Sequence, residues 1–173
     1  MLVFDFDGVL VDSVREAAVT GYNALSGETA TRLDDLPPGL FRIFRQNRPV
    51  IRSAPELFTL MGWCLDHCER EPEARLTREA FEDLLAQASV SSDDRAARFF
   101  EARERFMDAD REAWLALNAP FQPLWDRVRL RGGDGPVILT NKNRDAALAI
   151  CRHFGLAARP PLGGLRIGRD DVR

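Results

Sequence analysis

The spacing of hydrophobic and polar positions changes twice along the chain, near residue 14 and near residue 119. Residues 2–4 and 137–139 are short apolar runs, typical of parallel strands that are buried on both faces. Between them, over residues 14–118, apolar positions recur at helical spacing. The pattern predicts an α/β core, made of residues 1–13 and 119–173, that is interrupted by an all-helical insertion.

Start and stop signals mark the expected helices of the insertion. Ser13 and Glu16 have the spacing of a capping box, and Gly27 is placed to end the first helix. A loop and a short amphipathic helix follow. Pro55 suits the first turn of the next helix, and Thr77 suits the N-cap of the one after it. These signals predict several short helices joined by loops.

Two patterns of polar residues in the insertion have simple structural explanations. The longest helix, expected to begin at Ser92 and to run with breaks to about residue 117, alternates Arg and Glu as a solvated face does. Cys64, His67 and Cys68 lie within about one helical turn and could bind zinc, but no fourth ligand is placed nearby in the sequence. A packed helix with incidental cysteines is the favoured interpretation.

The second part of the predicted core reads as helix, turn, strand, helix and strand. A short helix is expected around residues 121–128, and a glycine-rich turn at 132–136 leads into the apolar run 137–139. Asn143 can cap the following helix, which Gly155 stops. A weak third strand is expected at residues 165–167. Strand, helix and strand in this order predict a right-handed parallel unit.

The amino-acid composition excludes only a few classes of protein. Apolar residues make up 45% of the 173 residues, and a formal net charge of −3 argues against a nucleic-acid-binding surface. No apolar stretch is long enough to span a membrane, and no signal peptide precedes the first expected strand. Three cysteines without an extracellular pattern suit a reducing cytoplasm. We expect a cytoplasmic protein without nucleic-acid or membrane partners, and the sequence does not indicate its oligomeric state.

The strongest candidate chemistry follows the first apolar run. Asp5 comes directly after it, and a charge in that position is costly unless it is paired or bound to a metal. Asp5 and Asp7 lie on the same side of an extended backbone, where their carboxyl groups can converge. Gly8 allows the backbone to bend sharply just beyond them. The simpler alternative is a strand followed by an acidic turn.

The run Phe4-Asp5-Phe6-Asp7-Gly8-Val9-Leu10-Val11-Asp12-Ser13 resembles the first motif of the haloacid dehalogenase (HAD) superfamily. The resemblance implies a Rossmann-like parallel sheet with an inserted helical cap that sets substrate choice. It also implies that Asp5 is the nucleophile taking a phosphoryl group and that Asp7 is the general acid and base. Because the dehalogenases lack a second aspartate, Asp7 favours the phosphatase and phosphomutase branches.

Thr140-Asn141-Lys142 resembles the second HAD motif in the form common among phosphoglycolate phosphatases. Ligands of parallel sheets bind beyond the carboxyl ends of the strands, so Thr140 and Asn141 are expected to hold phosphoryl oxygens. A capping turn is the alternative for both residues. The resemblance further implies Mg²⁺, bound by the Asp5 side chain and the Asp7 carbonyl, and a small phosphorylated metabolite hydrolysed through an aspartyl-phosphate.

The third-motif lysine and the fourth-motif acidic cluster are not matched. Asp170 and Asp171 follow Thr140 too closely, and Lys142, the only lysine, is a poor substitute because it lies in the second motif. Residues 167–172 resemble the stretch before the missing lysine, so we expect a chain that is truncated and inactive by itself. Two hypotheses stay open: a Mg²⁺-dependent phosphatase or phosphomutase, and a non-catalytic remnant that binds a phosphorylated ligand or a partner chain.

Overall fold

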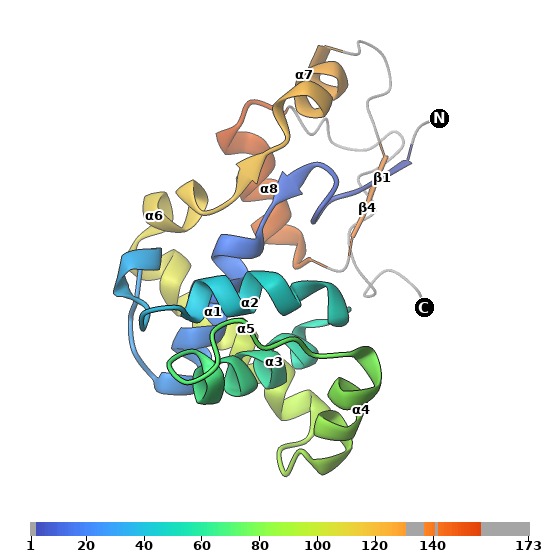
Figure 1. The fold of residues 1–173 in the computed structure, drawn as a ribbon. Coiled ribbons are helices and arrows are strands. Elements are labelled where there is room, and N and C mark those ends of the chain that lie inside the picture. The colour runs from blue at the N-terminus through green and yellow to red at the C-terminus, as the bar shows by residue number, and fades with distance from the viewer. Residues whose placement is uncertain (1–2, 131–136, 141, 157–173) are drawn as a thin grey trace. The chain divides into compact units, whose positions relative to one another are not determined.

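The computed structural model describes residues 3–130, 137–140 and 142–156 (Figure 1). The fold is mixed α/β and mostly helical. The chain divides into two compact units: Met1–Ser13 with Asn118–Arg173, named here the α/β unit, and Val14–Leu117, named the helical unit. Within the described ranges, no helix combines the length and the apolar character needed to cross a membrane.

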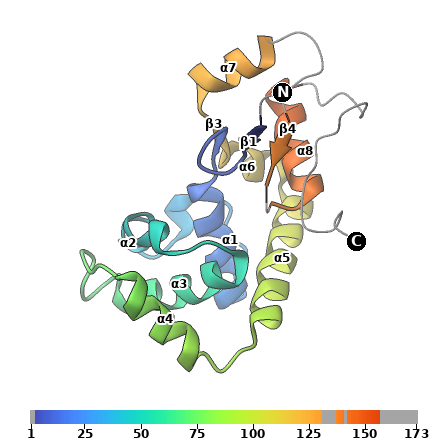
Figure 2. The ribbon, with the colours of Figure 1, turned by 90° about the vertical axis from the view of Figure 1, so that its right-hand side faces the viewer.

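Three helices that pack on one another, α1, α3 and α5, form the centre of the helical unit. The longest of them, α5, is seen along its length in Figure 2. In chain order the elements are α1 (Val14–Ser26), the 3₁₀ turn η1 (Leu33–Asp35), α2 (Leu40–Asn47), the 3₁₀ turn η2 (Arg48–Val50), α3 (Ala54–His67), α4 (Arg78–Gln87), α5 (Ser92–Ala109) and α6 (Arg111–Ala116).

The ends of these helices agree with most of the predicted signals. Gly27 follows α1 with a φ of 76°, and the Thr77 hydroxyl accepts a hydrogen bond from the first turn of α4. The cap of α5 is Ser91, one residue before the predicted start. The predicted break occurs at Asp110, whose carboxylate accepts from the first turn of α6. Side chains that satisfy the free N–H groups of a first turn therefore set several of the boundaries.

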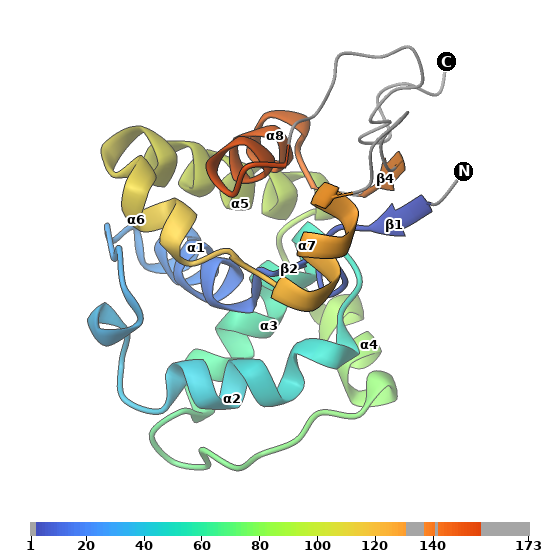
Figure 3. The same cartoon turned by 90° about the horizontal axis from the view of Figure 1, so that it is seen from above.

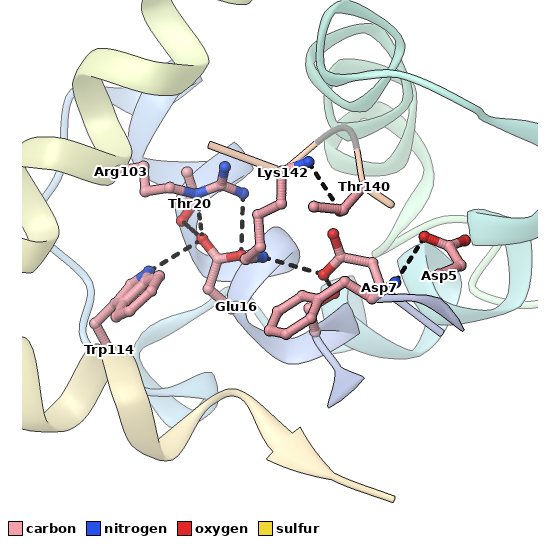
Figure 4. A network of polar contacts seen from close by, with 10 residues as sticks. Asp5, Asp7, Glu16, Thr20, Arg103, Trp114, Thr140 and Lys142 are labelled. Atoms are coloured by element: carbon pink, nitrogen blue, oxygen red, sulfur yellow. Dashed lines mark hydrogen bonds and ion pairs between the residues drawn. The ribbon is translucent and has the colours of Figure 1, made fainter. Parts of the chain in front are cut away.

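The prediction of a solvated Arg and Glu face on α5 is wrong at Arg95 and Arg103, which are both buried. The guanidinium of Arg103 makes a bidentate ion pair with Glu16 of α1. Its Nε lies 2.8 Å from Oε1 of Glu16, and its Nη2 lies 3.1 Å from Oε2. The capping-box prediction assigned Glu16 to the start of its own helix. Its carboxylate binds a cation from a helix far along the chain, as Figure 4 shows.

Glu16 is fully buried, and its carboxylate is satisfied by several donors. Its Oε1 atom also accepts hydrogen bonds from Thr20 Oγ1 at 2.8 Å and from the indole Nε1 of Trp114 at 3.2 Å. The Arg103 guanidinium carbon lies 4.8 Å from the centre of the Phe99 ring, where a cation is attracted to the ring face. These contacts join α1, α5 and α6 through one buried charge pair.

The α/β unit contains two small sheets. In chain order its elements are β1 (Val3–Asp5), β2 (Val11–Asp12), β3 (Ala119–Pro120), α7 (Gln122–Leu130), β4 (Val137–Leu139) and α8 (Arg144–His153). Strands β1 and β4 pair in parallel and lie side by side in Figure 3, whereas β2 and β3 pair antiparallel. The two predicted strands and the helices after them are therefore present. The predicted turn at 132–136 and the strand at 165–167 lie outside the described residues.

The prediction that both strands are buried on both faces is wrong for the part of the chain that the structure describes. In the parallel register Val3 pairs with Val137, and Asp5 pairs with Leu139. Val3 is 52% exposed and Leu139 61% exposed, whereas Ile138 is buried. Side chains alternate between the faces of a strand, so one face of this sheet is covered and the face carrying Asp5 is open among the described residues.

We expect Arg103→Met to lower the free energy of unfolding by about 3–5 kcal/mol, because it removes the guanidinium that is paired with the buried Glu16 carboxylate. Urea denaturation followed by circular dichroism measures the change. Replacing both partners, Glu16→Met with Arg103→Met, should recover part of the loss because no unpaired charge then stays buried.

The matched control is Glu73→Gln, which breaks the ion pair with Arg42 on the surface of the same unit. Those two side chains are 66% and 54% exposed, so its removal should cost less than about 1 kcal/mol. Equal losses in the Arg103→Met and Glu73→Gln proteins would contradict a stabilising role for the buried pair.

Candidate functional site

The residues after β1 fold into a tight turn that Gly8 makes possible. Phe6 is fully buried, and its carbonyl accepts from the N–H groups of Leu10 at 3.0 Å and of Val11 at 2.9 Å. Gly8 has a φ of 82° and donates its N–H to the Val11 carbonyl at 2.8 Å. The predicted bend at Gly8 is therefore confirmed. It directs the chain from β1 into β2 and places Asp7 between them.

The parallel pairing brings a second polar segment to the same end of the sheet. Asp5 stands beside Leu139, so Thr140 is the first residue past the carboxyl end of the neighbouring strand. Thr140 is buried, and its hydroxyl accepts from the N–H of Lys142 at 3.0 Å. Asn143 then caps α8, its side chain accepting from the N–H groups of Asp145 and Ala146. This confirms the predicted cap.

Asp7 accepts two hydrogen bonds on one carboxylate oxygen. Ser13 Oγ donates to Oδ1 at 2.6 Å, and Lys142 Nζ lies 3.1 Å from the same atom. The Lys142 side chain is only 2% exposed, compared with 28% for Asp7. Figure 4 shows the lysine reaching from the Thr140 segment to Asp7. The buried ammonium group of Lys142 therefore contacts the carboxylate of Asp7, to which the resemblance assigns acid–base chemistry.

Asp5 has a different environment. Asp5 is exposed, and its Oδ1 atom accepts a hydrogen bond from the backbone N–H of Phe6 at 2.7 Å. This bond directs the carboxylate along the turn at the end of β1. Asp5 is open to a ligand approaching the carboxyl ends of the strands, whereas Asp7 is held by side chains of its own unit.

Sequence reasoning underrated two residues of this cluster and named one that lies outside the described residues. Lys142 was considered only as a poor substitute for another lysine, and Ser13 only as a helix cap; both contact Asp7. The available signal was that the only lysine of an arginine-rich chain follows Thr140 by two residues. Asn141, which is expected to bind phosphate, is not among the residues that the structure describes.

The donors at this end of the sheet suit a hard cation. Mg²⁺ prefers oxygen ligands, keeps several waters and commonly uses only one or two carboxylates of a protein. The exposed carboxylate of Asp5 is such a donor, and Asp7 offers its backbone carbonyl while Lys142 occupies its side chain. Within the described ranges, no group of three or more His, Cys, Asp or Glu side chains gathers for a metal.

The Cys64, His67 and Cys68 group on α3 is packed into the helical unit. Burial raises the pKa of the Cys64 thiol to about 12, so the thiolate form that binds metals is disfavoured. His67 stacks on Trp63, and its Nδ1 lies 2.8 Å from the Trp63 carbonyl. Both observations favour the structural interpretation of these residues over a zinc site.

Gly8→Ala should destabilise the protein by about 1–2 kcal/mol, because an L-residue is strained at positive φ. No atom lies within 4 Å of the added Cβ, so the cost comes from the backbone and not from a clash. Gly62→Ala, inside α3, is the control and should stabilise by up to about 1 kcal/mol. Urea midpoints of the two variants should therefore move in opposite directions, and a Gly8→Ala protein as stable as the parent would refute the strained turn.

Comparison of the chain with protein-family models, with curated proteins and with solved structures gave no match. No family is therefore shown for this protein. Two observations bear on its function: the cluster of Asp5, Asp7, Thr140 and Lys142, and the resemblance of residues 4–13 and 140–142 to two motifs.

Proposed function

We propose that the protein is a Mg²⁺-dependent phosphatase of the HAD type, with a Rossmann-like core, that acts on a small phosphorylated metabolite. The observation that carries the proposal is the parallel pairing of β1 and β4. It places Asp5 and Thr140 at the carboxyl ends of adjacent strands, where ligands of parallel sheets bind. Asp7 lies two residues after Asp5 in the sequence, and we expect it to reach the same ligand.

In the first step Asp5 attacks phosphorus, and the bond between phosphorus and the ester oxygen breaks. Asp7 gives its proton to the departing oxygen, which leaves as an alcohol. The exposure of Asp5 supports its role as the nucleophile, because a substrate can reach it. The Thr140 hydroxyl and neighbouring N–H groups are suited to the phosphoryl oxygens.

In the second step water attacks the phosphorus of the aspartyl-phosphate. Asp7, now ionised, takes a proton from the water, and the bond to Asp5 breaks to release inorganic phosphate. Both catalytic residues return to their starting states. Mg²⁺, held by the Asp5 carboxylate and the Asp7 carbonyl, would supply positive charge that offsets the repulsion between two anions.

For a protein that carries residues 1–173 together with the unmatched lysine and acidic motifs, Asp5→Asn should abolish phosphate release, because the nucleophile is lost while the shape of the side chain is kept. Asp7→Asn should lower turnover of an alkyl phosphate by about two to four orders of magnitude, the usual contribution of acid–base catalysis. Phosphate release is measured with and without Mg²⁺. Removing the metal with a chelator should reduce turnover of the parent protein to background.

Binding of beryllofluoride, a mimic of a phosphoryl group on an aspartate, gives a readout that does not need turnover. Fluorine NMR should detect the complex in the parent protein with Mg²⁺ and lose it in Asp5→Asn. Asp12→Asn, at an aspartate of β2 that has no proposed catalytic role, is the control and should keep the signal. Turnover or beryllofluoride binding that survives Asp5→Asn would remove Asp5 from its role.

A further inference from the structure

We propose that Lys142 is a positioning residue that holds the Asp7 carboxylate in the orientation needed for proton transfer. The inference rests on the proposed function for its catalytic consequence. The contact itself is a geometric fact: Lys142 Nζ lies 3.1 Å from Asp7 Oδ1, and the lysine side chain is 2% exposed. Nothing in the resemblance to the HAD motifs assigns this lysine to Asp7.

The backbone around Lys142 is fixed on both sides. Its N–H donates to the Thr140 hydroxyl at 3.0 Å, and the next residue, Asn143, is the N-cap of α8. A long lysine side chain in water loses considerable conformational freedom when it is held in one place. Here part of that cost is offset because the backbone is already ordered by a buried threonine and a helix cap.

Burial makes the ion pair stronger than a surface contact. Removing an ammonium group from water is costly unless opposite charges or acceptor oxygens lie beside it, and attraction between charges rises as the surrounding medium becomes less polar. Ser13 Oγ donates to the same oxygen of Asp7, at 2.6 Å. Two donors from different segments therefore fix Oδ1, and we assign the proton transfers of the reaction to Oδ2.

If Lys142 acts by orienting Asp7, its removal should affect two kinds of phosphate ester differently. A role of Lys142 in phosphate binding would not distinguish them. An alkyl phosphate releases a strongly basic alkoxide, so its cleavage depends on the proton from Asp7. A 4-nitrophenyl phosphate releases a stable phenolate and needs that proton far less. Misplacing Asp7 should therefore slow the first step, transfer of the phosphoryl group to Asp5, selectively for the alkyl ester. The later hydrolysis of the aspartyl-phosphate is common to both esters and does not discriminate between them. Weaker phosphate binding or a damaged fold should slow the first step alike for both esters.

The experiment uses the protein that also carries the unmatched lysine and acidic motifs, and compares it with its Lys142→Met variant, an uncharged side chain of similar length, on both esters. In single-turnover measurements we expect the rate constant of phosphoryl transfer from the alkyl ester to Asp5 to fall about 10- to 100-fold, which is part of the full acid–base contribution. For the 4-nitrophenyl ester the same single-turnover rate constant should change less than about threefold. Arg144→Met removes an exposed cation two residues away and should leave both esters unaffected. Equal losses in this rate constant on the two esters would overturn the proposal.

A second measurement tests the contact without using activity. The urea midpoints of Lys142→Met, Asp7→Asn and the double variant form a thermodynamic cycle, and contacting residues give a double variant that is less destabilised than the sum of the singles. Strict additivity would overturn the Lys142 inference whatever the activity. Coupling in a protein without Asp5-dependent turnover would refute the phosphatase proposal and leave the contact in place.

Discussion

A charge that is taken out of water must meet an opposite charge, and this constraint organises both units of the protein. In the helical unit Glu16 is buried against Arg103, and in the α/β unit Lys142 is buried against Asp7. Each pair joins segments that are far apart in the sequence. Breaking a buried pair is costly, so each contact restricts how its unit can be packed. The first pair ties helices together, and the second ties the turn after β1 to the segment after β4.

The candidate site depends on that second contact and on the register of one short sheet. Three residue pairs between β1 and β4 bring Asp5 and Thr140 to the same edge. The turn at Gly8 then carries Asp7 past the end of β1, where Ser13 and Lys142 hold it. Asp5 is exposed and Asp7 is restrained. This difference in environment agrees with the division of labour in the proposed reaction, between an accessible nucleophile and an oriented acid and base.

Local signals in the sequence predicted the elements well because they act over a few residues. Thr77 and Asn143 cap helices as expected, and Gly27 follows the end of α1. Hydrophobic spacing also located both strands of the parallel pair. Predictions about how deeply these elements are buried were less accurate. The strands were expected to be covered on both faces, yet Val3 and Leu139 are exposed among the described residues. Burial depends on which other elements pack there, and local pattern does not contain that information.

The resemblance of residues 4–13 and 140–142 to two motifs nominated Asp5, Asp7 and Thr140. The sequence by itself determined the helical character of residues 14–118, the two strands and the bend at Gly8. These follow from side-chain spacing, backbone freedom and capping, all of which are local. Only the tertiary structure decided the partners of the charged groups. Arg103 looked like one of many solvated arginines, and Glu16 looked like a capping residue. Lys142 is separated from Asp7 by most of the chain. Such pairs form because folding buries both members together, and no periodicity along the sequence records which distant charge will satisfy which.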